Sequence, residues 1–253
     1  MSALGAAARK EWMEQRRTHR LLISVVVLVF FGLLSPLTAK FTPEIIKLLP
    51  NGAAMAQLIP PPTITDAFGQ YLKNVTQFGL VLALLTTMGA VAREKERGTA
   101  AMILVKPLSR GAFLGAKFAA IAGTFAVSLG AAALAGYYYT TLLFHAPDPL
   151  AWVALNGLIF GYLLVPVGVT LLCSVLAGSQ AAAGGMAFGA LAVLALVGSI
   201  PGVGAFLPGQ LLGWGAALMA GATPAHWPAL GVSAGIIGAS LAGAWWLLER
   251  QEL

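Results

Sequence analysis

The chain has 253 residues, of which 58% are hydrophobic and only 9% are charged. Soluble domains carry roughly 25% charged residues, so the chain has too little charge to coat a water-soluble globule of this size. The formal net charge is +6, and the basic residues flank apolar segments. This placement is typical of charge that orients a membrane protein and does not indicate nucleic-acid binding. The single cysteine, Cys173, excludes an internal disulfide and a metal site built on a cysteine pair.

Residues 1–20 form a polar and basic segment that contains Trp12. An aromatic residue among basic residues is typical of a helix that lies at the membrane surface. A solvated helix that leads into the first span is an equal alternative. We predict an interfacial helix over residues 1–20. The following run, Leu21–Ala39, is predicted to be a span rather than a signal peptide, because its long leading segment contains Glu11 and Glu14.

Six apolar segments are predicted to span the membrane, which takes about 20 residues each. They are Leu21–Ala39, Tyr71–Ala92, Phe113–Tyr139, Ala151–Leu176, Gly185–Ile200 and Pro228–Leu248. Residues 40–70 are too polar and too rich in proline to lie in lipid. Residues 201–227 are apolar but broken by prolines, and their unbroken part, residues 209–222, is too short to span. We therefore predict short re-entrant helices on the extracytoplasmic side there. The sequence indicates an all-α integral membrane protein with one transmembrane domain over residues 1–253.

The basic residues predict the orientation of the chain. If the N-terminus is cytoplasmic, 12 of the 15 lysines and arginines lie on the cytoplasmic side. Positive residues accumulate in cytoplasmic loops, so both termini and residues 93–112 are predicted to be cytoplasmic. If residues 209–222 formed a seventh span, the C-terminus would lie outside, and only Arg250 argues against that.

Three glycine pairs with GxxxG spacing lie in the predicted spans. They are Gly157/Gly161, Gly185/Gly189 and Gly231/Gly235. The spacing puts both glycines on one helix face, where another helix can approach closely. We expect these contacts to lie within one chain, with an interface between two chains as the alternative.

Motifs for chemistry are absent from the sequence. It has no phosphate-binding GxxxxGK[ST] loop and no HExxH motif, and its three histidines are far apart. We therefore predict no catalytic residue, no cofactor-binding residue and no metal ligand in this chain. A membrane-embedded enzyme would need converging carboxylates, histidines or metal ligands, which the sequence does not supply.

Ionisable residues are scarce in the predicted spans. Between residues 118 and 248, the one carboxylate or cationic side chain is Asp148, in a predicted loop. Carriers coupled to ions or protons need such groups within the membrane, so a stand-alone carrier or channel is the weaker alternative for the function. A path through the helices would then be apolar or lined by hydroxyls and amides. The candidate lining residues are Thr76, Gln77, Thr86 and Thr87.

The densest charge cluster of the chain lies between the second and third spans. Within Arg93–Arg97, the acidic Glu94 and Glu96 alternate with basic residues. Orientation requires only basic residues, whereas mixed charge suits docking to a partner protein. A glycine and a proline bracket the next segment, which predicts a short helix over Thr99–Val105.

The same loop carries a specific pattern. The sequence reads E-K-E-R-G-T over Glu94–Thr99, P-L-S-R over Pro107–Arg110 and G-A-K over Gly115–Lys117. This pattern resembles the permeases of the ABC type-2 exporter family, and the opening Arg9–Trp12 is similar to the start of the same family. The resemblance is specific over the 25 residues from Arg93. Beyond them it rests on the number and spacing of the helices.

The resemblance implies a six-helix permease subunit of an ATP-driven exporter in the inner (cytoplasmic) membrane. Two permease chains, identical or different, would form the path, with the second and fifth spans lining it. Two separate ATPase subunits would bind ATP and Mg and carry out hydrolysis, so this chain would be no enzyme and would hold no cofactor. Residues 93–112 would be the coupling loop that an ATPase subunit receives. The implied contact residues are Arg93, Glu94, Lys95, Glu96, Arg97, Gly98, Thr99, Pro107, Ser109 and Arg110.

The substrate is not identified by any motif. The apolar helices favour a hydrophobic or amphiphilic molecule. The scattered methionines do not indicate a copper route.

Overall fold

The computed structural model of the chain describes residues 3–48, 50, 52, 60–96, 98, 109–223 and 225–250. Helices account for nearly all the regular structure in these ranges, and no strand occurs in them. The elements are α1 (Ala3–Arg17), α2 (Arg20–Lys47), α4 (Ile64–Thr87), α5 (Ala92–Glu96), α7 (Arg110–Leu143), α8 (Pro149–Leu176), α9 (Gln180–Gly198), the 3₁₀ turn η1 (Gly204–Phe206), α10 (Gly209–Met219) and α11 (Trp227–Arg250).

Six helices in the described part of the chain are long and apolar enough to cross a membrane. Five of them are α2, α7, α8, α9 and α11, and the sixth is α4 joined with α5. This confirms the predicted all-α membrane protein with six spans. The helix boundaries differ from the predicted ones, because several helices continue into polar sequence.

The start of α4 is an example of this difference. We predicted the second span from Tyr71, but α4 begins at Ile64. The carboxylate of Asp66 accepts hydrogen bonds from the backbone N–H of Thr63 at 2.8 Å and from its hydroxyl at 2.7 Å. Such a reciprocal cap satisfies the free donors of a helix start, so it stabilises a first turn that hydropathy alone does not identify.

The end of α2 also extends beyond its apolar run. We predicted the first span to end at Ala39, but α2 continues through Pro43 to Lys47. In this polar end, Thr42 donates its hydroxyl to the carbonyl of Thr38 at 2.6 Å. The first span is therefore one long helix.

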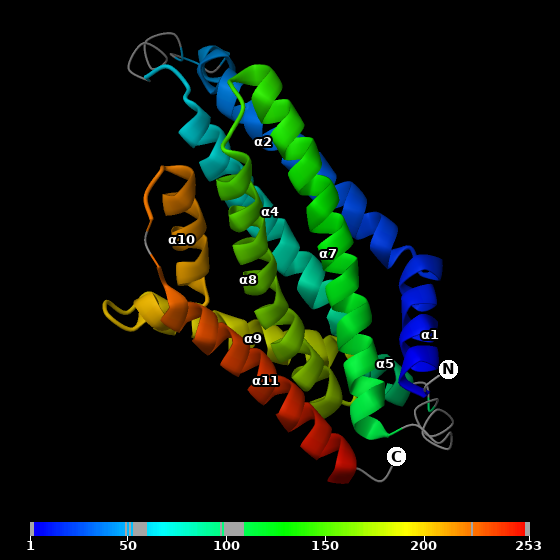
Figure 1. The fold of residues 1–253 in the computed structure, drawn as a ribbon. Helices are drawn as coiled ribbons and strands as arrows, with labels where there is room; N and C mark the ends of the chain where they lie inside the picture. Colours follow the sequence, from blue (N-terminus) through cyan, green and yellow to red (C-terminus); the bar gives the residue numbers. More distant parts are fainter. Residues whose placement is uncertain are drawn as a thin grey trace.

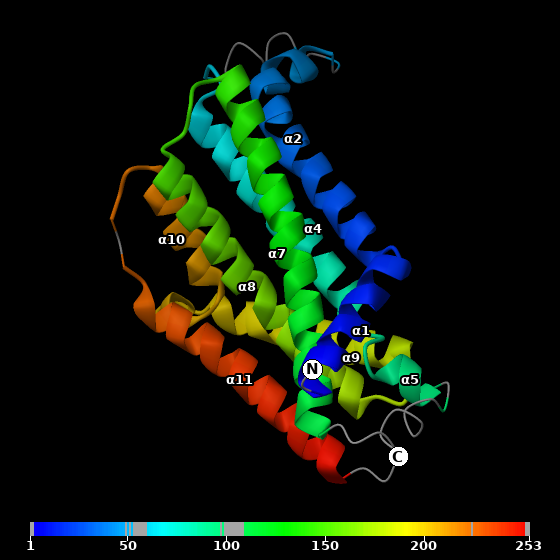
Figure 2. The same cartoon turned by 45° about the vertical axis from the view of Figure 1, so that its right-hand side comes forward.

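The helices form an elongated bundle. Helices α2, α4, α7 and α8 run lengthwise beside one another, while α9 and α11 cross them obliquely over one half of the molecule (Figures 1 and 2). Helices α1 and α5 and the last turns of α11 lie at the same end of the bundle, which is called the α5 end below. The opposite end carries the start of α4 and the connection between α7 and α8.

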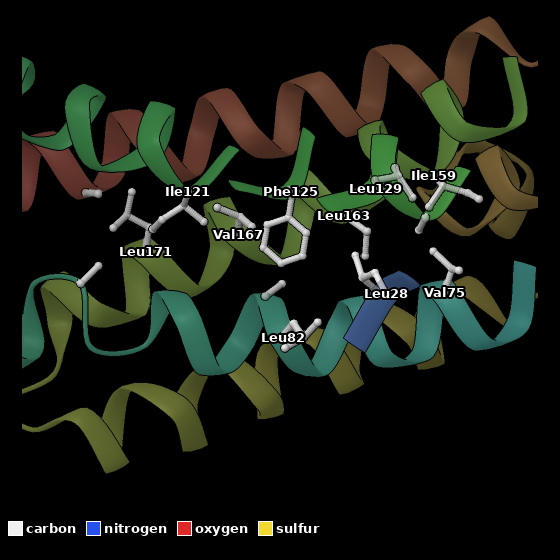
Figure 3. Close-up of a cluster of buried hydrophobic side chains, with 14 of the residues drawn as sticks. Leu28, Val75, Leu82, Ile121, Phe125, Leu129, Ile159, Leu163, Val167 and Leu171 are labelled. Carbon is white, nitrogen blue, oxygen red and sulfur yellow. The ribbon is translucent and has the colours of Figure 1, made fainter. Parts of the chain in front are cut away.

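The core lies between the four lengthwise helices. Side chains from all four meet there (Figure 3), and the labelled ones are Leu28, Val75, Leu82, Ile121, Phe125, Leu129, Ile159, Leu163, Val167 and Leu171. Lipid removes much of the hydrophobic drive for helix association, so close packing must hold the helices together. At Gly32, an added Cβ would lie 2.8 Å from the backbone oxygen of Ala132, which shows how closely α2 and α7 approach.

The predicted GxxxG pairs do not provide such packing. An added Cβ would meet open space at five of these glycines: Gly157, Gly185, Gly189, Gly231 and Gly235. The prediction of contacts within one chain is therefore wrong for these positions. The close approaches lie instead at glycines without that spacing, such as Gly32 and Gly136, where the neighbour is a backbone atom or a large ring.

Residues 201–227 contain η1 and α10. Helix α10 has 11 residues, which is a rise of about 16 Å, roughly half the ~30 Å of a bilayer core. It packs mainly against α8, with Leu211 and Trp214 buried beside Leu158. A short helix is thus present where the sequence predicted one, and its re-entrant course stays a prediction.

Candidate functional site

The break between α4 and α5 is held by a single hydroxyl of α8. Ser174 Oγ accepts hydrogen bonds from the backbone N–H groups of Val91 and Ala92, each at 3.0 Å, and donates to the carbonyl of Met88 at 2.9 Å. These backbone groups lose their helical partners where the chain turns, and a buried group without a partner is costly. Ser174 therefore fixes the point at which the charged loop leaves the bundle.

Helix α5 is tied to the junction of α8 and α9. The guanidinium of Arg93 donates two hydrogen bonds to Gln180 Oε1, at 2.7 and 3.0 Å. The ammonium of Lys95 donates to the carbonyl of Val175. The backbone N–H of Gln180 in turn donates to Glu96 at 3.4 Å. Contacts from three of its five residues make α5 a fixed platform at the start of the loop.

Glu94 points to a buried lysine of α7. Its carboxylate lies 2.8 Å from Lys117 Nζ, and the same ammonium lies 3.3 Å from both carboxylate oxygens of Glu11 on α1. The side chain of Lys117 is 3% exposed and that of Glu11 is 7% exposed. Charged groups are rarely buried unless they are paired, so this pairing is what permits their burial. The three residues are called the Lys117 cluster below.

The surroundings of the Lys117 cluster are partly apolar and partly charged. The ring of Phe113 lies 4.8 Å from the ammonium of Lys117, a distance suited to a cation–π contact. Lys10 Nζ lies 3.3 Å from Glu11 on the solvent side and is half exposed. Carboxylate oxygens of Glu11, Glu14 and Glu94 lie within 4.8 Å of one another. Because Lys117 already contacts two of these carboxylates, the grouping gives no separate indication of a metal ion.

The predicted ATPase contacts fall into three groups. Arg93, Glu94 and Lys95 make the internal contacts described above, and Arg110 donates to the carbonyl of Leu248 on α11. Exposed residues among the described part of the loop are Glu96, Gly98 and Ser109. Ser109 also caps α7 by accepting from the N–H of Ala112 at 3.2 Å. Arg97, Thr99, Pro107 and the predicted helix over Thr99–Val105 lie outside the described residues.

The four predicted path-lining residues lie on different faces of α4. Gln77 is exposed, whereas Thr76, Thr86 and Thr87 are buried within the chain. The hydroxyls of Thr76 and Thr86 each donate to a carbonyl of their own helix at 2.6 Å. Of these four polar side chains, Gln77 is therefore the one that reaches the surface.

Sequence reasoning missed the Lys117 cluster. Lys117 was counted only as one of the cytoplasmic basic residues, but it lies inside α7 among buried residues. The sequence did carry a signal for this cluster at Glu11, the partner of Lys117 on α1. The acidic Glu11 stands in a segment where orientation requires only basic charge, and the same reasoning had been applied to Glu94 and Glu96 alone.

Two comparisons with known proteins show what the chain is similar to. The family model described as "ABC-2 family transporter protein" matches residues 6–212. A protein named "Uncharacterized transmembrane protein YxlG", from Bacillus subtilis (strain 168), is 26% identical over 215 residues, which cover 83% of this chain and 83% of that protein. The region matched by the family model contains all three residues of the Lys117 cluster.

Proposed function

Because the chain belongs to the ABC-2 transporter family, we propose that it is the permease subunit of an ATP-driven exporter. Two permease chains form the path, and two separate ATPase subunits bind and hydrolyse ATP. The observation that carries the proposal is the family match, which extends from α1 to α10 and includes α5 and the start of the charged loop. The six apolar helices are consistent with a multi-pass membrane subunit.

The charged loop is proposed to receive the motion of the ATPase subunit. ATP draws two such subunits together, and their motion reaches the membrane only through a stiff contact. Helix α5 offers such stiffness, because its side chains are held by α7, α8 and α9. Glu96, Gly98 and Ser109 are exposed beside it and are the described residues best placed to touch a partner.

The path is proposed to lie between two permease chains, along α4 and α9. One stripe of α4 is exposed at helical spacing and consists of Lys73, Gln77, Val81 and Leu85. Along α9, only Ala183 and Ala187 are buried, and Gly185 and Gly189 have open space beside them. These helix faces make few contacts within the chain, so they are available to a second chain, to lipid or to a substrate.

The proposed substrate is hydrophobic or amphiphilic. A cavity of about 650 Å³ lies between α8, α9, η1 and the start of α10. Its lining has no charged side chain, and Tyr162 and Gln210 are among the few polar groups in it. Ligand pockets of this size that are mostly apolar suit molecules held by burial and a few hydrogen bonds. A charged molecule would find no counter-charge there.

The orientation is proposed from the basic residues. With α1 and the charged loop in the cytoplasm, 12 of the 15 lysines and arginines lie inside, and the protein resides in the cytoplasmic membrane. A reporter fused after Leu253 is expected to be cytoplasmic. A periplasmic reporter signal would contradict this topology and would mean that residues 209–222 span.

A pull-down tests the main proposal. The tagged chain, solubilised from its native membrane, is expected to bring down an ATPase subunit with measurable ATP hydrolysis. Reversing the charge of Glu96 should reduce the recovered ATPase, whereas the same change at the exposed Glu44, at the opposite end of α2, should not. A single-chain eluate without ATPase would favour a stand-alone channel or carrier.

A further inference from the structure

We propose that Lys117 is a positioning residue that makes α1 move together with α5 when the ATPase subunits close. The link passes from Glu94 on α5 through the ammonium of Lys117 to Glu11 on α1. This inference rests on the proposed function. It adds a specific route by which motion at the charged loop reaches the N-terminal helix.

The first observation is that three separate helices converge on one ammonium. Glu11 and Lys117 are 106 residues apart, and Glu94 and Lys117 are 23 apart. Neither carboxylate is brought to Lys117 by a local turn of the chain. The three side chains are buried or largely buried, so water screens their attraction less than it would at the surface. A displacement of Glu94 therefore acts directly on the other two.

The second observation is the charge balance of the cluster. One ammonium holds two carboxylates, those of Glu11 and Glu94. Glu11 is also attracted by the half-exposed Lys10 and by Arg20. Without Lys117, the two carboxylates would repel each other across the same small space. Lys117 thus binds α1 and α5 to each other as well as to α7.

The third observation is a hinge at the other end of α1. Thr18 and His19 separate α1 from α2, and His19 adopts a left-handed backbone conformation with φ of 57°. On the far side of this break, Arg20 donates to the carbonyl of Thr86 at 3.2 Å, which fixes the start of α2 to α4. Helix α1 is therefore joined to a fixed point by a short break and is held by the Lys117 cluster in its middle. This is the geometry of a lever.

Helix α1 packs closely on α7 through an aromatic ring. Trp12 lies over Gly123, where an added Cβ would be 3.0 Å from the ring. The charge pair at Lys117 adds a contact of defined direction to this packing.

The test measures the position of α1 in the assembled complex. Spin labels are placed at Met13→Cys on the exposed side of α1 and at Leu142→Cys near the far end of α7, in a Cys173→Ala background. The distance distribution is recorded with and without a non-hydrolysable ATP analogue. The complex of otherwise unchanged sequence is expected to show a nucleotide-dependent shift.

Variants then separate the link from general stability. Glu94→Gln should abolish the shift, because it removes the one negative charge of α5 that contacts Lys117 and leaves the pair between Glu11 and Lys117. Lys117→Arg should retain the shift, because a guanidinium can hold both carboxylates. Lys10→Met is the matched control, since it removes the half-exposed cation beside the same Glu11 and should also retain the shift. ATPase recovery in the pull-down should equal that of the unchanged chain for Lys117→Arg and Lys10→Met, and the shift of Glu94→Gln is measured in complexes that retain the ATPase.

The outcomes decide between this inference and the proposed function. A full shift in Glu94→Gln with ATPase bound overturns the inference and leaves the proposed function standing. If Glu94→Gln fails to assemble, Glu11→Gln replaces it, because Glu11→Gln keeps α5 tied to α7. A full shift in Glu11→Gln overturns the inference, and loss of the shift in Glu11→Gln supports the inference. An ATPase-bound complex of unchanged sequence without any shift overturns the inference alone. A chain that recovers no ATPase overturns the proposed function and the inference together.

Discussion

Helices α8 and α9 follow each other in the chain and are both strongly apolar, yet they occupy different environments. In α8, 15 of 28 residues are buried within the protein, whereas in α9 only two of 19 are. Their lengths and compositions both permit a membrane span. The difference is therefore not one of hydrophobicity, because lipid is as apolar as a protein core.

Polar side chains account for the difference. Asn156, Thr170 and Ser174 are buried along α8, and two of them bond to groups of other helices. Between its first residue and its last, α9 has no side chain with a hydrogen-bonding group. A helix of this kind gains little from one particular neighbour in its own chain, so it remains available to a second chain or to a substrate.

The largest expected effect in this comparison follows from removing a core leucine of α8. Leu163 is fully buried, and Leu163→Ala should lower the free energy of unfolding by about 2–5 kcal/mol through lost packing. The same change at Leu196 of α9, which is 69% exposed, should cost no more than about 0.5 kcal/mol. Thermal unfolding in detergent measures both. Equal losses would contradict the assignment of α8 to the core and α9 to the periphery.

The next effect concerns the polar end of α8. Ser174→Ala would leave the N–H groups of Val91 and Ala92 without their shared acceptor, which should cost about 1–3 kcal/mol. Ser199, at the end of α9, donates only to the carbonyl of Leu196 among the described contacts. Ser199→Ala is thus the matched control and should be neutral. Hydrogen exchange of the α5 amides is the measurement, and unchanged protection in Ser174→Ala would exclude the capping role.

A smaller effect is expected at the contact between α4 and α8. The hydroxyl of Tyr71 donates to Asn156 Oδ1 at 2.7 Å inside the core. Tyr71→Phe should cost about 1 kcal/mol, because the ring stays packed and one hydrogen bond is lost. Tyr138→Phe, at a side chain that is 67% exposed, should leave the unfolding temperature unchanged. A neutral Tyr71→Phe would mean that other packing holds these two helices together.

The smallest expected effect on the stability of one chain concerns α9. Leucine at both Gly185 and Gly189 would project into open space, so the fold of the single chain should tolerate the double change. Capture of an untagged copy by a tagged one should fall by about tenfold, equivalent to about 1.4 kcal/mol. Gly238→Leu on α11, which also faces open space, is the control. Unchanged capture would place the interface between chains elsewhere.

Much of the fold could be predicted from the sequence, because hydropathy and length identify all six spans. The extra turns could not be predicted from the same signal. They depend on local hydrogen bonds, such as the cap formed by Thr63 and Asp66 at the start of α4. Hydropathy alone also could not predict the division between α8 and α9, since an apolar residue gives no indication of whether protein or lipid surrounds it. The polar residues of α8 were the signal in the sequence for its burial.

The sequence pattern located the candidate site but did not show how its residues are arranged. The pattern identified the charged loop, and alternating charges suggested that Glu94 and Glu96 face the same kind of partner. In the structure the two differ, because Glu94 is paired with Lys117 inside the chain and Glu96 is exposed. Neighbours in a short helix point in different directions, and only the position of α7 determines which of them is buried.

The separation of Glu11 and Lys117 by 106 residues also sets an order for biosynthesis. At roughly 5–20 residues per second, the ribosome needs about 5–20 s to reach Lys117 after it has made Glu11. During that interval the carboxylate of Glu11 has no buried cation to meet, and an unpaired charge is costly to bury. Helix α1 must therefore wait in a hydrated place until the third span has been made. The first helix to leave the ribosome thus docks only after the third span has been made.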